Sequence, residues 1–429
     1  MKYRLIDICS ITKGATGIMK ADGGKYPLVA LGEERRNHSE FQFDAKAVIV
    51  PLISSTGHGH ASMKRVHYQE GKFALGNILC AVIPKDETQL HPKYLHLYLQ
   101  QFKNSLLVPL MKGAANVSLP MNKLADVEIE VPSLERQLEI IALAEEAAEY
   151  KNELEERLIA QDSDVAKLRQ AFLKEAFRGR LAPQSTEIVD RMQLLNEIEE
   201  NKIKLTNLRK YKPLIASERL EIKSMIYDLP VSWQWFRLGE VAFFQEGPGI
   251  RTWQFTKTGI KLLNVQNILK DDTVDYLNSD KYISEREFNE KYKHFQIESG
   301  DIIWASSGAS WGKIAWHKDP GFTIMLNTST VRLKFYSPKL YDPYLYYFLK
   351  TDFFKNQMTP QLMGLQPNFG ATHLSRTYIP IPPFSEQINI VKRIEEIMQL
   401  CDELQYSIQQ SKIENEKLLQ GALRDALKK

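Results

Sequence analysis

Short apolar runs and one alternating segment mark the first third of the chain. The runs at residues 26–31, 47–50 and 77–83 have strand length and are bounded by Gly, Pro or Asn. Strict alternation at 127–131 predicts a strand with one solvated face. A helix with proline near its first turn is predicted over 92–102. Residues 1–134 are therefore predicted to form a mixed α+β domain.

A long helix is predicted next. From Glu135 to about Arg180 there is no proline, and the only glycine is Gly179. Ser133 can cap the start, and eight acidic residues between Glu135 and Glu156 suit the positive end of the helix dipole. Such a helix would be roughly 65–70 Å long, too long for one small domain. An apolar stripe with coiled-coil-like spacing comprises Leu154, Leu158, Val165, Leu168, Phe172 and Ala176.

This helical segment occurs twice. Residues 131–177 align with residues 381–427 at a constant offset of 250 and without a gap. Identical pairs include Pro132/Pro382, Gln137/Gln387, Glu145/Glu395, Leu154/Leu404, Leu168/Leu418 and Leu173/Leu423. We interpret the match as an internal duplication. The second stripe would be Leu404, Ile408, Asn415, Leu418, Ala422 and Ala426. Two homologous stripes predict an antiparallel helix pair in which Asn415 fixes the register.

The features of the first domain also recur in order. Residues 237–241 match residues 4–8, and the glycine-rich segment at 247–250 follows where 14–18 followed. Residues 301–304 parallel 47–50, and 343–345 parallel 92–95. Residues 182–228 are hydrophilic, with a helix predicted over 188–209. The predicted partition is a first α+β domain (1–134), a central helix (135–181), a helical connector (182–228), a second domain of the same plan (229–384) and a C-terminal helix (385–429).

Composition and charge narrow the class of protein to which the chain can belong. The hydrophobic content of 43% and charged content of 25% are ordinary for globular proteins. No apolar run approaches membrane-spanning length, and the first residues show no signal-peptide pattern. Three widely spaced cysteines favour free thiols in a reducing cytoplasm. The net charge of +3 conceals 16 Lys and Arg against 12 Asp and Glu in residues 1–130, and 17 against 14 in 231–384. Mildly basic domains suit a polyanion.

Three motifs carry a resemblance to a known family. They are Leu229-Pro-x-x-Trp233-x-Trp235-x-x-Leu238-Gly239-Glu240, Ile379-Pro-Ile-Pro-Pro-x-x-Glu386-Gln387 and Arg178-Gly-Arg-Leu181. Together with the duplication, they make the whole chain resemble the specificity subunit of type I restriction–modification systems. One departure is that the first domain lacks the Leu-Pro-x-x-Trp segment, which concerns the local packing of its N-terminus.

The resemblance implies both fold and function. Two target-recognition domains would each read one half of a split double-stranded DNA site, and two long antiparallel helices would set the gap. Two modification subunits would dock on the helices and methylate adenine N6 with S-adenosylmethionine, so this chain would hold no cofactor and catalyse nothing. Whether restriction subunits join the complex stays open in the sequence. Because the domains differ in sequence, the two half-sites are expected to differ.

Candidate catalytic motifs fail on their chemistry. Ile381-Pro-Pro-Phe384 resembles an amino-methyltransferase motif, but an Ile in its first place cannot accept a hydrogen bond from a base amino group. Gly308–Lys313 is one residue short of a phosphate-binding loop, with Ile314 where Ser or Thr is required. His58-Gly59-His60 lacks a third metal ligand at useful spacing. We expect neither a catalytic nor a metal site.

DNA contact is predicted from loops at matching places in the two domains. Arg and Lys suit guanine and phosphates, whereas Asn and Gln suit adenine. The candidates are Thr16, Lys20, Arg35, Arg36, His58, Lys64, Arg65 and Asn116 in the first domain, and Arg251, Gln266, Asn267, Ser310, Lys313, Gln366 and Asn368 in the second.

Alternatives remain open at this point. The acidic face from Glu145 to Glu156 is either a solvated helix surface or a contact for a partner protein. A helical scaffold whose globular ends bind proteins would share the pattern, and salt-dependent DNA binding separates it from a DNA reader. A self-sufficient enzyme would require a motif that the sequence lacks.

Overall fold

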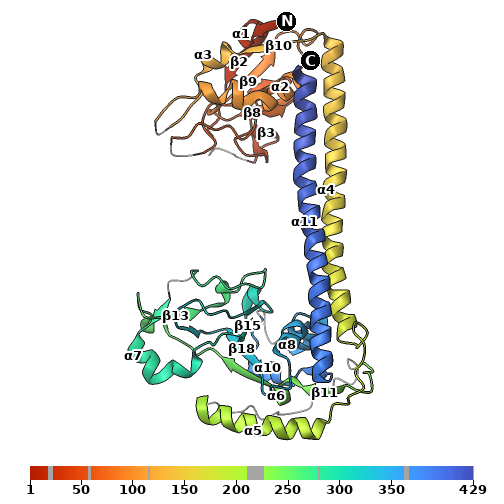
Figure 1. Ribbon diagram of the computed structural model, residues 1–429. Coiled ribbons are helices and arrows are strands. Elements are labelled where there is room, and N and C mark those ends of the chain that lie inside the picture. The colour runs from red at the N-terminus through yellow and green to blue at the C-terminus, as the bar shows by residue number, and fades with distance from the viewer. Residues whose placement is uncertain are drawn as a thin grey trace. The chain divides into compact units, whose positions relative to one another are not determined.

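The chain divides into two compact units, which we describe separately. The computed structural model describes residues 1–17, 23–56, 59–114, 116–209, 227–278, 281–361 and 367–428. The first unit comprises residues 1–160 and 408–429, and the second comprises residues 161–407. Each unit contains an α+β domain and a part of each long helix, α4 (Leu134–Ala176) and α11 (Phe384–Lys428) (Figure 1).

The first unit is built on two four-stranded sheets. A short ladder of β1 (Lys2–Arg4) and β10 (Glu128–Glu130) brings together its first and last strands. One sheet is antiparallel, in the order β2 (Cys9–Lys13), β9 (Leu79–Pro84), β6 (Ala47–Pro51) and β7 (His67–Gln69). The other has the order β4 (Arg36–His38), β3 (Tyr26–Val29), β8 (Lys72–Leu75) and β5 (Phe43–Asp44). The helices are α1 (Leu5–Ile8), α2 (Pro92–Leu106) and α3 (Met121–Ala125).

The second unit repeats this plan. Its terminal ladder joins β11 (Gln234–Arg237) and β19 (Tyr378–Ile381). The antiparallel sheet has the order β12 (Ala242–Glu246), β18 (Thr330–Phe335), β15 (Ile302–Ala305) and β16 (Ile314–Trp316). The other sheet has the order β14 (Tyr282–Ile283), β13 (Ile260–Leu263) and β17 (Ile324–Leu326). The helices are α5 (Arg191–Arg209), α6 (Leu238–Val241), α7 (Glu285–Glu287), α8 (Asp342–Leu349), α9 (Asp352–Met358) and α10 (Ala371–Arg376).

The strand order confirms that the two domains share one fold. In the first domain β9 pairs with both β2 and β6, and in the second domain β18 pairs in the same way with both β12 and β15. In both, the second sheet contains one parallel pair, β3–β8 or β13–β17. The predicted correspondences hold, because β15 occupies the place of β6 and α8 begins at the position equivalent to the start of α2.

The hydrophobic core of each domain extends onto both long helices. In the first unit, Ile140 from the start of α4 and Leu427 from the end of α11 belong to the domain core. In the second unit, Ala176 from the end of α4 and Ile390 from the start of α11 do the same. Burying a Leu or Ile side chain in such a core stabilises the fold by about 1.5–3 kcal/mol. The core of each domain therefore packs against the beginning of one long helix and the end of the other.

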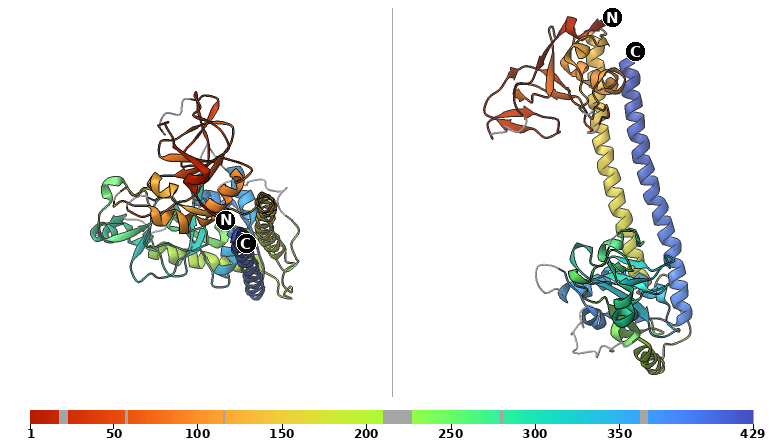
Figure 2. Two further views of the ribbon diagram at one scale, coloured as in Figure 1. Left: turned by 90° about the horizontal axis from the view of Figure 1, so that it is seen from above. Right: turned by 90° about the vertical axis from the view of Figure 1, so that its left-hand side faces the viewer.

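Within the second unit, the two long helices run antiparallel. Gln405 Nε2 donates to Asp162 Oδ1 at 3.1 Å, and Arg169 Nη2 donates to Asp402 Oδ1 at 2.6 Å. Moving forward along α4 thus means moving backward along α11. Figure 2 gives two further views of the helices.

The predicted apolar stripes are only partly buried. Leu158 and Val165 are buried, and Leu154, Phe172, Ile408 and Asn415 are half-buried. The prediction fails for four residues that are exposed, which are Leu168, Leu404, Leu418 and Ala422. An ideal helix drifts by about 20° per heptad against a 3.5-residue repeat, so a stripe extrapolated over several turns leaves the buried face. Outside the predicted stripe, Ile397 and Cys401 of α11 are buried, and Leu419 and Leu423 are half-buried.

The structure explains why the first domain can lack the Leu-Pro-x-x-Trp segment. Trp233 is buried in the second unit and donates from Nε1 to Glu386 Oε1 at 2.9 Å. The position equivalent to Glu386 in the duplication is Arg136, which forms an ion pair with Glu139 at 2.7 Å instead. A buried carboxylate requires a partner. An arginine in partial contact with solvent fits the domain that lacks the tryptophan.

Candidate nucleic-acid interface

The first loop of each domain approaches a neighbouring turn so closely that only glycine fits. Gly14 N donates to Leu79 O at 2.9 Å, and a Cβ on Gly14 would lie 2.2 Å from Gly76 O. In the second unit Gly247 N donates to Thr330 O at 2.8 Å, and a Cβ there would lie 1.9 Å from the backbone oxygen of Asn327. The same contact therefore positions the first loop of both domains at the same end of the antiparallel sheet.

Three of the predicted loops in the first unit lie together at that end. Ser54 N donates to Val117 O at 2.9 Å, which joins the loop after β6 to the loop at 112–118. Lys64 N donates to Ser55 Oγ at 2.9 Å within the loop after β6. Arg65 forms an ion pair with Glu33 at 2.7 Å, which adds the loop at 33–38. The structure thus assembles loops that are far apart in the sequence.

Two predicted contact residues of the first unit are engaged within the protein. The Arg35 guanidinium donates to Gln69 Oε1 at 3.1 Å and to Glu33 O at 3.0 Å, and burial lowers its pKa. Arg65 is three-quarters buried and paired with Glu33. These two arginines hold the loops together in this structure.

The remaining predictions for the first unit divide by exposure. Arg36, Lys64 and Asn116 are exposed, whereas Thr16 is half-buried and bridges to Gly76. Lys20 and His58 lie outside the described residues. DNA contact by these residues stays a prediction.

In the second unit, a turn at 327–329 connects three predicted loops. Thr328 Oγ1 donates to Pro248 O at 3.2 Å, and Asn327 Nδ2 donates to Asn264 Oδ1 at 2.6 Å. Ser306 N donates to Ser329 O at 2.9 Å, and Ser329 adopts a positive φ of 69°. This turn is not among the loops predicted from the sequence. Its signal was the polar run Asn-Thr-Ser-Thr between two apolar strands.

The fourth loop of the second unit joins the same surface. Ser307 and Asn368 form an antiparallel bridge, and Phe369 N donates to Ser306 O at 2.9 Å. Asn368 is exposed, and Ser310 and Lys313 are half-buried. Gln366 lies outside the described residues. Four loops therefore meet at one end of this sheet, as they do in the first unit.

Asn267 requires a correction. It is fully buried, its Nδ2 donates to Asp275 O at 2.7 Å, and its Oδ1 accepts from Asn264 N at 2.8 Å. The side chain shapes the loop and is not available to a base edge. Gln266 beside it is exposed, as is Arg251.

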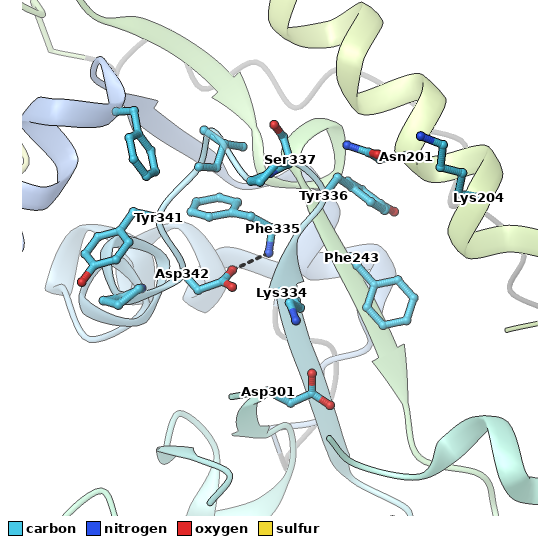
Figure 3. A pocket seen from close by; sticks show the side chains of 14 residues that line it. Asn201, Lys204, Phe243, Asp301, Lys334, Phe335, Tyr336, Ser337, Tyr341 and Asp342 are labelled. Atoms are coloured by element: carbon cyan, nitrogen blue, oxygen red, sulfur yellow. Dashed lines mark hydrogen bonds between the residues drawn. The ribbon is translucent and has the colours of Figure 1, made fainter. Parts of the chain in front are cut away.

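A cavity of about 610 Å³ lies at the opposite end of the same sheet (Figure 3). Phe243 and Lys334 from paired strands line one side, and Asn201 and Lys204 of α5 line the other. Both carboxylates of the cavity are engaged in the protein. Asp342 Oδ1 accepts from Phe335 N at 2.8 Å, and Asp301 pairs with Arg332 at 3.2 Å. Burial raises the pKa of Asp342. The cavity is separate from the assembled loops.

The described parts of the chain were also searched for metal sites, membrane-spanning helices and reactive thiols. Across them, no group of three or more His, Cys, Asp and Glu could hold a metal ion. Nor does any described helix combine the length and apolarity needed to cross a bilayer. Cys9, Cys80 and Cys401 are buried free thiols, and burial raises the pKa of Cys9 and Cys80 to about 12. A thiol with so high a pKa is a poor nucleophile at neutral pH.

Comparisons with known proteins agree on one family. The model of the type I restriction modification DNA specificity domain matches residues 1–161 and 230–415. The chain is 27% identical over 284 residues to the specificity subunit of the type I restriction enzyme EcoAI from Escherichia coli, covering 63% of this chain and 46% of the relative. It is 29% identical over 188 residues to the MjaVIII specificity subunit from Methanocaldococcus jannaschii, covering 42% and 43%. These alignments span less than half the length of each relative.

A solved structure supports the fold. It comes from work on complex assembly and conformational transition of the type I R-M system, with 17% identity, a TM-score of 0.59 and coverage of 100% of this chain and 97% of that one. The chain belongs to the type I restriction modification DNA specificity family. The resemblance drawn from the duplicated helix and its flanking motifs is thereby confirmed, as is the α+β class with two recognition domains.

Proposed function

We propose that this chain is the DNA-recognition subunit of a type I restriction–modification complex, and that each unit reads one half of a bipartite, asymmetric site. The observation that carries the proposal is the assembly of four loops at the same end of the same sheet in both units. The strand order that supports the loops is the same in the two units, but the exposed side chains of the loops differ. The first unit presents Arg36 and Lys64, and the second presents Arg251, Gln266 and Asn368. Different side chains on equivalent frames favour different half-sites.

Methylation is assigned to partner subunits. We propose two modification subunits that bind S-adenosylmethionine and methylate adenine N6, with this chain supplying sequence recognition alone. Exposed apolar residues on the long helices support docking there. Tyr150 and Ile159 on α4 are 60% and 68% exposed, and Leu404 and Tyr406 on α11 are 50% and 67% exposed. We propose that the modification subunits cover these side chains, since burying large apolar groups that are left in water is favourable. The acidic residues from Glu145 to Glu156 would border that contact.

Methylome mapping combined with a domain exchange tests the proposal. Residues 1–134 would be replaced by the corresponding domain of another family member, and modified adenines would be mapped genome-wide before and after. We expect one half of the modified site to change and the other half to stay the same. A change in both halves, or in neither, would refute independent reading by the two units.

A further inference from the structure

An exposed tryptophan follows the first loop of the second unit. The Trp253 side chain is 80% exposed, whereas the other five tryptophans of the chain are buried or half-buried. An aromatic side chain can remove about 150–250 Å² from water when it is buried. Leaving the indole in solvent forgoes that stabilisation, so packing within the unit does not explain the residue.

The backbone on both sides of Trp253 is firmly held. It lies in a 3₁₀ turn, Thr252–Gln254, in which Arg251 N donates to Gln254 Oε1 at 2.9 Å. Gln254 is buried, and its Nε2 donates to Tyr292 Oη at 3.2 Å. Ile250 before the turn belongs to a buried apolar cluster. The exposed indole is therefore presented on a fixed support, which lowers the entropy cost of contact with a ligand.

The surroundings of Trp253 are basic. Residues 247–270 contain four Lys and Arg and no Asp or Glu. Arg251 and Lys257 are exposed on either side of the indole in the sequence. The segment is continuous with the assembled loops, because Thr328 Oγ1 donates to Pro248 O at 3.2 Å. In duplex DNA the base faces are stacked on one another, so an aromatic side chain contacts base edges in a groove, including the thymine methyl group, while neighbouring cations hold the phosphates.

We propose that Trp253 places its indole against the bases of the half-site read by the second unit, while Arg251 and Lys257 contact the flanking phosphates. This inference rests on the proposed function and adds a contact residue that polarity alone does not reveal. The contact is specific to one half-site, because residues 14–25, the equivalent segment of the first domain, contain no aromatic residue. The indole carries no charge, so its share of the affinity is independent of salt, unlike that of the cations.

The experiment measures DNA binding by the full chain with its modification subunits bound. The probe is a fluorescein-labelled duplex carrying the site found by methylome mapping, titrated at several salt concentrations. We expect Trp253→Ala to weaken binding about tenfold without changing the salt slope, since the loss of one base-edge contact gives effects of this order. Trp253→Phe should retain most of the affinity. Phe322→Ala is the matched control, because Phe322 is 43% exposed in the same unit and precedes β17 at the end of that strand away from the loops.

Acrylamide quenching gives a second readout. Duplex DNA should protect a quenchable tryptophan component in the wild type, and that component should be missing from Trp253→Phe. Wild-type affinity in Trp253→Ala, an equal loss in Phe322→Ala, or quenching that DNA leaves unchanged would overturn this inference while the proposed function stands. A wild-type complex that does not bind its mapped site would overturn both.

Discussion

Gln137 and Gln387 lie 250 positions apart and share two matching hydrogen bonds, each within its own unit. Oε1 accepts from a backbone amide at 2.8 Å in both, His91 N for Gln137 and Tyr341 N for Gln387. Each side-chain amide also donates to the proline carbonyl five residues earlier, at 3.0 and 2.9 Å. Both side chains are buried. The duplicated glutamine thus ties the first turn of each long helix to its domain.

Gln387→Ala should destabilise the second unit by about 2–6 kcal/mol, because it removes the partner of the part-buried Tyr341 amide and of the buried Pro382 carbonyl, at about 1–3 kcal/mol each. Chemical denaturation of the full chain measures the loss. Gln399→Ala is the control, since Gln399 is an exposed residue of the same helix. The equivalent Gln137→Ala should cost the first unit a similar amount. A loss no larger than that of the control would contradict the anchoring role.

The identical glutamines show why the fold could be predicted. A side chain that satisfies backbone groups cannot be replaced without loss of stability, so the same residue is found in both halves of the duplication. The same holds for Gly14 and Gly247, each of which lies close to a turn. The loops could be predicted as a set, but their individual roles could not. Sequence polarity does not distinguish a side chain that faces solvent from one that satisfies backbone groups. Asn267, which donates to Asp275 O, and Arg35, which donates to Glu33 O, belong to the second kind.

Gly247→Ala should disturb the loops of the second unit, because its Cβ would overlap the Asn327 backbone. We expect weaker discrimination at the half-site read by that unit and no change at the other. Gly249→Ala is a closely matched control, since a Cβ there meets no atom of the described residues within 4 Å. Methylome mapping of both variants would show the difference. Equal fidelity in the two variants would mean that the turn at 327–329 does not position the reading loops.

Lys64→Ala should weaken binding to all DNA sequences alike and flatten the salt dependence, because loss of one phosphate contact reduces the slope of log K against log salt by about one. The control is Lys2→Ala. Lys2 is also exposed, but it lies on β1 and pairs with Glu130. Titrations at several salt concentrations give both slopes. A sequence-selective loss in Lys64→Ala would assign Lys64 to a base instead of a phosphate.

The stability of the chain should depend on pH through His67. Burial, with smaller effects from the charges of Arg35 and Arg65, lowers the pKa of His67 from 6.5 to about 4. Between these values the unfolded chain binds a proton that the folded chain does not. The free energy of unfolding therefore falls as the pH drops from about 6.5 toward 4, by about 2 kcal/mol at pH 5.

His67→Phe removes this contribution and fills a similar volume, and among the described residues Nε2 of His67 has no hydrogen-bond partner to lose. Its stability relative to the wild type should therefore rise between pH 8 and pH 5. Denaturation midpoints at the two pH values measure the change. Parallel pH profiles for the two proteins would show that His67 is not the titrating group.

The spacing role of the long helices can be tested by lengthening both. The insertion has to lie inside the helices, because α4 ends at Ala176 and Gly179 adopts a positive φ of 73°. Seven residues inserted after Ala160 and seven after Ser407 preserve the heptad phase and add about 10.5 Å to each helix. At about 3.4 Å per base pair, the unread gap should grow by about three base pairs. The bases read on either side should not change, since neither domain is altered.

Genome-wide mapping of modified adenines measures both the gap and the bases read. An unchanged gap in a complex that still methylates would show that the helices do not set the spacing, and a change in the bases read would show that the helices also orient the loops.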